Sequence, residues 1–473
     1  MNTFKDAVDN QEARTENGMK ARKSTDSSLV NLFFKIGASR GKDIIPDFVS
    51  ALVEDEDVAV RIALWARDIR GGSGERKLFR DVLNYLEVHR PELAIRVAKK
   101  VPEVGRWDDL LVFNTPSLLN VAFEMIQNAL SQKDGLCAKW MPRKGDIAVK
   151  LREYLGMTPK QYRKTLVNLT KVVETQMCSN DWDNINFSHV PSVASSRLKK
   201  AFNRHTPKYA EYVAALVKGD NPEVKVNTGA VYPYDILKGL NGYYYDSISY
   251  DTTELNHMIK QWEALPNYVG DAKILPMVDV SGSMTCSAGG KGSVSCLDVA
   301  VSLGLYLSEK NTGDFKDLFL TFSGTPELLH LKGNIVDRSK QMIKSTWHMN
   351  TDLHSAMNKI LSVAKKSNVP QEDMPEMLLI LSDMQFDQCA SFDHSAMEMI
   401  SSKFDEAGYK IPNIVFWNIN ARDNVPVKYD TRGVALVSGF SPAIMKAVLS
   451  SDTEQFTPQA IMLKAVMNER YSF

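Results

Sequence analysis

Cysteine is scarce in this sequence, and neither cysteine nor histidine occurs at the spacing of a zinc site. The five cysteines among 473 residues are scattered and form no C-x-x-C pair. This excludes a disulfide-rich secreted scaffold and a structural zinc site of the usual kinds. We expect a cytoplasmic protein with reduced thiols, which are Cys137, Cys178, Cys286, Cys296 and Cys389.

Long apolar runs and an excess of charge of one sign are also missing. No stretch approaches 18 consecutive apolar residues, and the start of the chain lacks a basic segment followed by an apolar one. The sequence therefore predicts neither a membrane span nor export. Lys and Arg together number 57, as do Asp and Glu, which excludes a histone-like polycation. If nucleic acid binds, it must bind through local patches.

The length and the apolar patterns predict a multidomain protein. Residues 1–28 are polar and are expected to form a flexible lead-in. Residues 29–268 show apolar residues at three- and four-residue spacing, which predicts an all-α domain of HEAT-like helical repeats, as a ring or a horseshoe. The expected helices cover residues 28–36, 44–53, 57–70, 75–89, 91–100, 116–132, 147–154, 159–176 and 207–218.

The pattern changes near residue 274, and residues 269–473 are predicted to form a second domain. Short apolar runs at 274–278, 318–322, 328–331, 377–381, 413–417 and 434–437 alternate with helical patterns. This alternation predicts an α/β doubly wound sheet with helices on both faces. In such sheets, ligands bind beyond the carboxyl ends of the strands.

Oxygen-bearing side chains follow two of the predicted strands and open a helix. Asp279, Ser281 and Ser283 come directly after the run 274–278, Asp383 follows the run 377–381, and Thr351 stands at a predicted helix start. Carboxylates and hydroxyls converging at one sheet edge suit Mg²⁺, or another divalent cation, because that ion prefers oxygen ligands. We therefore expect a metal site.

Two alternatives to a filled metal site stay open. Ser, Thr and Asp are favoured at helix N-caps, and these residues can serve only that purpose. A degenerate site of the same shape can also lack metal. No pair of a nucleophile and a base accompanies the set, so the sequence favours binding over metal-assisted hydrolysis, and no enzyme is expected.

With these elements in this order, residues 270–450 resemble the von Willebrand factor A domain and its metal-ion-dependent adhesion site. The resemblance implies that Ser281 and Ser283 bind the ion directly, and that Asp279, Thr351 and Asp383 bind it directly or through water. It also implies an open coordination position for water or for a carboxylate donated by a protein partner. The long loop at 285–295 departs from the usual pattern.

Basic and aromatic residues are interleaved between residues 139 and 171. Cations neutralise phosphates while aromatic rings stack on unpaired bases, so this composition suits single-stranded RNA. A second basic cluster lies between residues 197 and 208. The candidate RNA-binding residues are Lys139, Trp140, Arg143, Lys144, Lys150, Arg152, Lys160, Tyr162, Arg163 and Lys164, then Arg197, Lys199, Lys200 and Arg204.

Less specific interpretations of these residues exist. A charge run on a helix is often its solvated face, and Trp140 or Tyr162 can instead pack between helices. The glycine-rich stretch from Gly71 to Gly74 lacks the spacing of a phosphate-binding P-loop and is predicted to be a turn between two helices.

The helical half carries characteristic motifs at residues 15–18, 32–37, 63–80, 104–110, 140–142, 155–162, 174–183, 190–194 and 232–235. Through these motifs it resembles the TROVE module of Ro ribonucleoproteins, and more closely a branch of uncharacterised TROVE-like proteins with a von Willebrand A domain in plants, bacteria and phages. In Ro proteins the repeats form a ring that binds small structured RNAs and single-stranded RNA ends. The resemblance implies such a ring here, closed by the metal-site domain.

The first functional hypothesis is therefore a non-enzymatic, Ro-like RNA-binding protein whose partner is a small non-coding or misfolded RNA. The second is a metal-dependent protein-interaction or assembly module in which RNA plays no part. A metal-dependent hydrolase is disfavoured for lack of a base, and a role in building a larger particle stays open.

Overall fold

The computed structural model describes residues 12–237, 251–288, 294–322, 324–345, 352–387, 395–420, 424–450 and 456–473. The chain divides into two compact units. The first, called the sheet unit here, comprises Met1–Ile62 and Val231–Met467, and the second, called the helical unit, comprises Ala63–Ala230 and Asn468–Phe473. Residues 29–62 and 231–268, which the sequence placed with the helical repeats, thus cluster with the sheet.

The sheet unit is built on a mixed sheet with the strand order β5-β4-β3-β6-β7-β8. All neighbouring strands pair in parallel except the edge strand β5, which is antiparallel to β4. The order reverses between β3 and β6, so these central neighbours form the switch point of a doubly wound sheet. The strands are β3 (Ile274–Asp279), β4 (Leu318–Phe322), β5 (Glu327–His330), β6 (Met377–Ser382), β7 (Asn413–Asn418) and β8 (Val434–Ser438).

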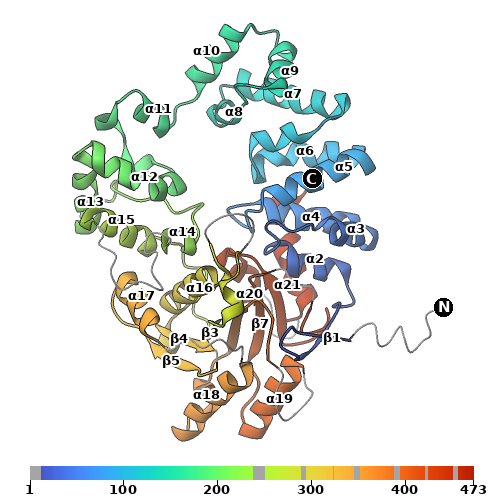
Figure 1. The fold of residues 1–473 in the computed structure, drawn as a ribbon, viewed down its shortest axis with the longest axis vertical. Helices are drawn as coiled ribbons and strands as arrows, with labels where there is room; N and C mark the ends of the chain where they lie inside the picture. Colours follow the sequence, from blue (N-terminus) through green and yellow to red (C-terminus); the bar gives the residue numbers. More distant parts are fainter. Residues whose placement is uncertain are drawn as a thin grey trace, which may run out of the picture. The chain divides into compact units, whose positions relative to one another are not determined.

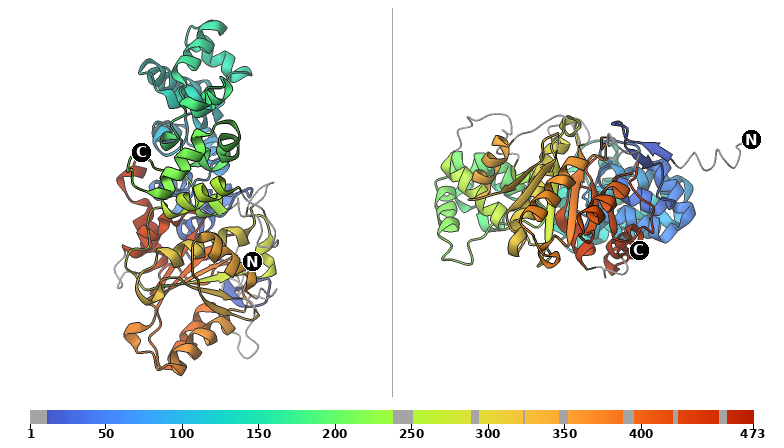
Figure 2. Two further views of the ribbon diagram at one scale, coloured as in Figure 1. Left: turned by 90° about the vertical axis from the view of Figure 1, so that its left-hand side faces the viewer. Right: turned by 90° about the horizontal axis from the view of Figure 1, so that it is seen from below.

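Helices cover both faces of this sheet, which is why its central strands are apolar throughout. Every residue of β3 and β6 is buried, as expected for parallel strands between two helical layers. Figures 1 and 2 show α16 (Cys296–Lys310) on one face and α18 (Leu353–Lys366) with α19 (Ala396–Ala407) on the other. The α/β prediction for this part of the chain is confirmed.

The N-terminal segment belongs to the sheet unit. Helix α2 (Ser28–Ile36) packs against β8, and the Ser438 hydroxyl donates to the Phe33 carbonyl at 2.8 Å. Ahead of it, β1 (Glu12–Arg14) pairs with β2 (Lys20–Arg22), and Arg22 exchanges backbone hydrogen bonds with Val425. The described part of the polar lead-in is therefore structured. Further helices of this unit are α3 (Ile45–Glu54), α14 (Pro233–Leu237), α15 (Thr252–Glu263), α17 (Ile335–Lys344), α20 (Met445–Leu449) and α21 (Pro458–Val466).

The helical unit begins within α4 (Glu56–Arg67) and consists of amphipathic helices that bury one apolar face each. The helix predicted over residues 159–176 is interrupted: α10 ends at Leu169 and α11 begins at Val173. The helices are α5 (Lys77–His89), α6 (Pro91–Val104), α7 (Pro116–Ser131), α8 (Gly135–Trp140), α9 (Asp146–Tyr154), α10 (Pro159–Leu169), α11 (Val173–Cys178), α12 (Ser192–His205) and α13 (Lys208–Lys218).

The glycine-rich stretch after α4 is a turn, as the sequence predicts. The amides of Gly72 and Gly74 both donate to the Asp68 carbonyl at 3.1 Å, and the Ser73 amide donates to the Trp65 carbonyl at 3.3 Å. The Asp68 carboxylate accepts hydrogen bonds from Arg470 at 2.5 and 3.0 Å, so the last residues of the chain are held against this turn.

Replacing Gly72 by alanine should destabilise the helical unit. A Cβ at this position would lie 1.7 Å from the carbonyl oxygen of Trp65, and a backbone atom cannot move aside cheaply. We expect Gly72→Ala to lower the free energy of unfolding by about 1–3 kcal/mol, measured by urea denaturation followed by far-UV circular dichroism. Gly229→Ala, where no atom lies within 4 Å of the new Cβ, is the control. Equal midpoints for the two variants would contradict this packing.

Candidate metal centre and candidate nucleic-acid interface

The predicted metal residues meet at the switch point of the sheet. Asp279 is the last residue of β3, and Asp383 follows the last residue of β6, the neighbouring strand. Both aspartates are fully buried, and Ser281 is 1% exposed. The pairing of two parallel strands thus brings together residues that are more than one hundred positions apart in the sequence.

Hydrogen bonds link these side chains into one cluster. The hydroxyls of Ser281 and Ser283 are 3.1 Å apart, and Ser283 donates to Asp383 Oδ1 at 3.4 Å. Asp279 accepts from the Ser281 amide at 2.9 Å and from the Ser382 hydroxyl at 2.6 Å. Ser382 is a participant that the sequence analysis missed, although it directly precedes Asp383. Thr351, the remaining predicted ligand, lies outside the described residues.

The cluster concentrates negative charge in a buried place. Burial, reinforced by the charge of Asp383, raises the pKa of Asp279 to about 7, although hydrogen bonds from Ser281 and Ser382 oppose the rise. A cation between the two carboxylates would relieve this repulsion. The donor set, with two carboxylates and two hydroxyls, has the chemistry that Mg²⁺ prefers. Among the described residues, no group of three or more His, Cys, Asp or Glu side chains could hold a metal ion, so any site here depends on the hydroxyls.

The basic segment of the helical unit presents its charges to solvent. Helices α9 and α10 bury Leu151 and Leu166 and turn their cations outward. Lys139 and Arg152 are half-buried, and Lys139 lies 3.9 Å from Glu174. In the part of the chain that the structure describes, no ion pair engages the exposed cations Arg143, Lys144, Lys150, Lys160, Arg163, Lys164 and Lys171.

The aromatic residues of this segment differ in their surroundings. Tyr162 is buried, and its hydroxyl donates to the Pro142 carbonyl at 3.0 Å. Its ring therefore packs between helices, the alternative that the sequence left open, and is not available to stack on a base. Tyr154 is exposed and leans on Phe123, with ring centroids 5.4 Å apart. Trp140 lies under the Arg106 guanidinium, 3.3 Å from the ring centroid.

The second basic cluster lies on α12, which exposes Arg197, Lys200 and Arg204 and half-buries Lys199. The segment of sequence that contains this cluster has few aromatic residues, but the fold places a stacked pair of rings at the end of α12. Trp182 stacks on His205, with centroids 4.4 Å apart and planes inclined by 8°. No sequence signal connected these two residues, because they are brought together by the fold of η2 (Trp182–Asn184) against α12.

A cavity of about 740 Å³ opens beside the basic segment. Its walls come from α8, the end of α10, α11 and the residues around η3 (Phe187–His189). Lys139, Lys171 and His189 line it, together with Glu174. The cavity is therefore mixed in polarity and borders the exposed cations.

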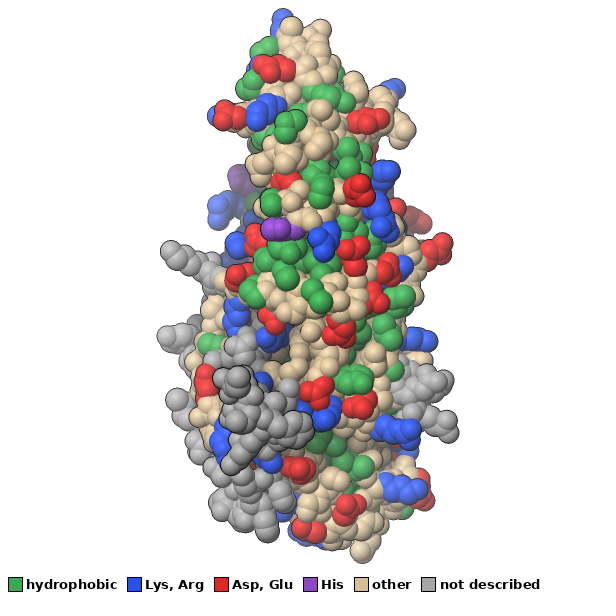
Figure 3. Space-filling view, turned by 90° about the vertical axis from the view of Figure 1, so that its right-hand side faces the viewer, with side chains coloured by type: hydrophobic (Ala, Val, Ile, Leu, Met, Phe, Trp, Pro, Cys, Tyr) green, Lys and Arg blue, Asp and Glu red, His purple; other side chains and the backbone are tan. Residues whose placement is uncertain are grey.

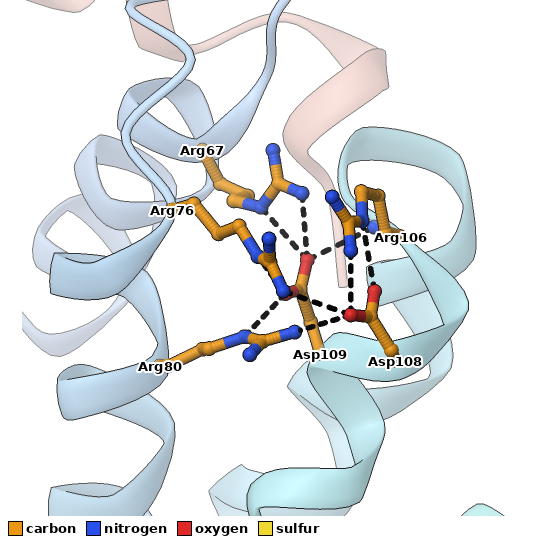
Figure 4. A network of polar contacts seen from close by, with 6 residues as sticks. All are labelled: Arg67, Arg76, Arg80, Arg106, Asp108 and Asp109. Carbon is orange, nitrogen blue, oxygen red and sulfur yellow. Dashed lines mark hydrogen bonds and ion pairs between the residues drawn. The ribbon is translucent and has the colours of Figure 1, made fainter. Parts of the chain in front are cut away.

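A network of four arginines and two aspartates occupies the junction between α4, α5 and η1 (Trp107–Val112), as Figure 4 shows. Asp109 is completely buried and accepts from Arg67 Nε at 2.8 Å, from Arg80 Nε at 2.6 Å and from the Arg106 amide at 2.9 Å. Asp108 accepts from two nitrogens of Arg106, at 2.8 and 2.6 Å, and from Arg76 at 2.8 Å. The two stretches, residues 63–80 and 104–110, both belong to the motifs of the TROVE resemblance, but no pattern in the sequence connects them.

The comparisons with known proteins concern most of the chain. The chain is 31% identical to the uncharacterized protein L728 of Acanthamoeba polyphaga mimivirus, over 95% of this chain and 86% of that protein. This chain belongs to the family of that viral protein. Two models of domains of unknown function match as well, DUF2828 over residues 124–272 and DUF7788 over residues 273–470. The first match contains the basic segment, and the second contains the candidate metal centre.

A solved structure is also similar. The Ro (RSR) protein of Deinococcus radiodurans matches with a TM-score of 0.46 and 14% identity, covering 94% of this chain and 100% of that one. Within the described residues, no helix is long and apolar enough to cross a membrane. On the face drawn in Figure 3, Lys and Arg side chains alternate with Asp and Glu side chains, in keeping with a net charge of zero.

Breaking the network at Asp109 should be costly. Asp109→Asn leaves the arginines around it without their buried counter-charge, and losing one partner of a buried ion pair costs about 3–5 kcal/mol. We expect a loss of this size in the free energy of unfolding, measured by urea denaturation. Asp81→Asn, in the exposed pair of Asp81 with Lys77 at 3.0 Å, should change stability by less than about 0.5 kcal/mol. If Asp109→Asn leaves the free energy of unfolding unchanged, the network does not stabilise the helical unit.

Proposed function

We propose that this chain is a non-enzymatic RNA-binding protein whose helical unit contacts RNA through the basic segment at residues 139–171. The observation that carries the proposal is the set of exposed cations on α9, α10 and the turn before α9, which form no ion pair among the described residues. Cations without internal partners are available to neutralise phosphates.

The geometry of α10 supports a phosphate-binding face. Lys160, Arg163 and Lys164 are spaced three and four residues apart, so they lie on one side of the helix, and all three are exposed. The opposite side carries Tyr162 and Leu166, which are buried. This face therefore combines clustered charge with a rigid support. The motif resemblance to the TROVE module favours RNA over other polyanions.

Removing the charges of this face should weaken RNA binding. We expect the triple variant Lys160→Gln, Arg163→Gln, Lys164→Gln to bind a hairpin with a single-stranded 3′ tail about tenfold more weakly at low salt. Because each single-strand phosphate contact contributes about 0.7 to the slope of log affinity against log salt, that slope should become shallower by about 2. Filter binding across a salt series measures both quantities.

The matched control removes the same charge from the sheet unit. Lys359, Lys365 and Lys366 are exposed on α18, and their replacement by glutamine should leave the affinity unchanged. If the two triple variants lose RNA affinity equally, the attraction is non-specific and the basic segment is not the binding site. Wild-type affinity no higher than that of an acidic control protein would end the proposal.

We further propose that the sheet unit is a von Willebrand A-type domain that binds Mg²⁺ or another divalent cation. Support comes from the buried pair Asp279 and Asp383, the hydroxyls of Ser281 and Ser283 beside them, and the place of all four at the switch point. Thr351 would complete the set. Such a cation would supply an electrostatic anchor for an oxygen ligand.

Mg²⁺ titration by calorimetry tests this site. Wild-type protein should bind one ion saturably, and Asp279→Asn and Asp383→Asn should bind about tenfold more weakly or worse. Asp271→Asn, which alters an exposed carboxylate ahead of β3, is the control. If these aspartates only cap turns, Asp279→Asn and Asp383→Asn will lose stability. In that case neither the wild type nor any variant will bind Mg²⁺ saturably.

The same pair of carboxylates favours a second candidate function, a protein-interaction module in which the bound cation grips a partner's carboxylate. Its signature differs from that of RNA binding. Partners recovered with the protein would be lost in EDTA and in Asp279→Ala, whereas nuclease treatment would leave them in place.

A further inference from the structure

The arginine network in the helical unit carries more positive charge than its own carboxylates balance. Among the six side chains drawn in Figure 4, four guanidiniums, those of Arg67, Arg76, Arg80 and Arg106, face the two carboxylates of Asp108 and Asp109. Counted over these six side chains alone, the guanidiniums exceed the carboxylates by two, and the network is partly removed from water. Burial together with the charges of Arg80 and Arg106 lowers the pKa of Arg76 in spite of Asp108 and Asp109.

Two buried donors of this network lie near carboxylates but make no hydrogen bond of good geometry. Arg76 Nε lies 3.6 Å from Asp109 Oδ1, and Arg80 Nη2 lies 2.9 Å from Asp108 Oδ2, both as ion pairs without a hydrogen bond among the described residues. Buried donors are almost always satisfied in native proteins, so these two could each donate to a further, better-aligned oxygen. With two surplus positive charges nearby, an anion is the matching species.

Solvent reaches this network from one side. The side chain of Arg76 is 41% exposed, and those of Arg80 and Arg106 are about one quarter exposed, whereas Arg67 and Asp109 are buried. The buried pair is therefore structural, and Arg76, Arg80 and Arg106 form an accessible rim. Forked guanidinium groups on such a rim suit the oxygens of a phosphate.

The rim continues into the basic segment. Arg106 lies on the ring of Trp140, and the Lys139 ammonium is 5.4 Å from the centroid of the same ring. Lys139 and Trp140 are the first residues of the basic and aromatic stretch. A chain of phosphates passing along that stretch would thus reach Arg106 and then Arg76 and Arg80.

We infer that Arg76, Arg80 and Arg106 hold a backbone phosphate of an RNA strand bound to the helical unit. This inference rests on the proposed RNA-binding function and assigns it an anchoring point outside the segment found from composition. Removing one rim arginine should therefore remove one contact between the protein and an RNA phosphate.

The test compares neighbouring charges in the full-length protein. Arg76→Gln should weaken binding of a single-stranded 12-nucleotide RNA about three- to tenfold and make the salt slope shallower by about 0.7. Arg80→Lys keeps the charge but loses the fork, and should also weaken binding. Lys77→Gln removes a charge from the adjacent position, 78% exposed, and should change affinity less than twofold. Thermal melts confirm that each variant folds.

Inorganic phosphate separates this inference from the function on which it rests. At constant ionic strength, phosphate should raise the melting temperature more than chloride does in the wild type and in Lys77→Gln, and this difference should be smaller in Arg76→Gln, where only the general stabilising effect of phosphate is left. If RNA binds but Arg76→Gln and Arg80→Lys behave as Lys77→Gln, the inference is overturned and the proposed function stands. If phosphate acts through Arg76 but no RNA binds, the anion site stands and the RNA function falls. If neither RNA nor phosphate binds, both are overturned.

Discussion

A buried carboxylate needs compensating positive charge, and this requirement organises both units of the protein. In the helical unit, Asp109 is completely buried at the junction of α4, α5 and η1, and the guanidiniums of Arg67 and Arg80 supply its counter-charge. The helices can meet there only if these ions are in place, because an isolated buried charge is far too costly. The glycine-rich turn at Gly72 then places α5 so that Arg80 can reach the aspartate.

The two units concentrate charge of opposite sign. At the switch point of the sheet, Asp279 and Asp383 are both buried, and hydroxyl and amide donors around them carry no full charge. That cluster therefore concentrates carboxylates. The arginine network, in contrast, has more guanidiniums than carboxylates among its six side chains. A net charge of zero for the whole chain conceals both local imbalances.

Much of the architecture could be predicted from periodicity. The apolar runs before Asp279 and Asp383 became β3 and β6, and the helical patterns with proline at their first turn became α6, α7 and α10. Local pattern could not show that residues 29–62 cluster with the sheet, since an amphipathic helix reveals that it has a partner but not which one. For the same reason it could not distinguish the buried Tyr162 from the half-buried Trp140, whose ring lies under Arg106.

By itself the sequence determined the class of each half, the strand ends that carry the candidate metal residues, and the stretch of exposed cations. These features depend on residue spacing along a single element, which a linear pattern records fully. Only the tertiary structure decided that Asp279 and Asp383 share one buried cluster with Ser382, that Arg76, Arg80 and Arg106 converge around Asp108, and that this rim continues to Trp140. Such contacts arise where separate elements pack against each other. The separation of two residues along the chain does not tell how far apart their side chains lie in the folded protein.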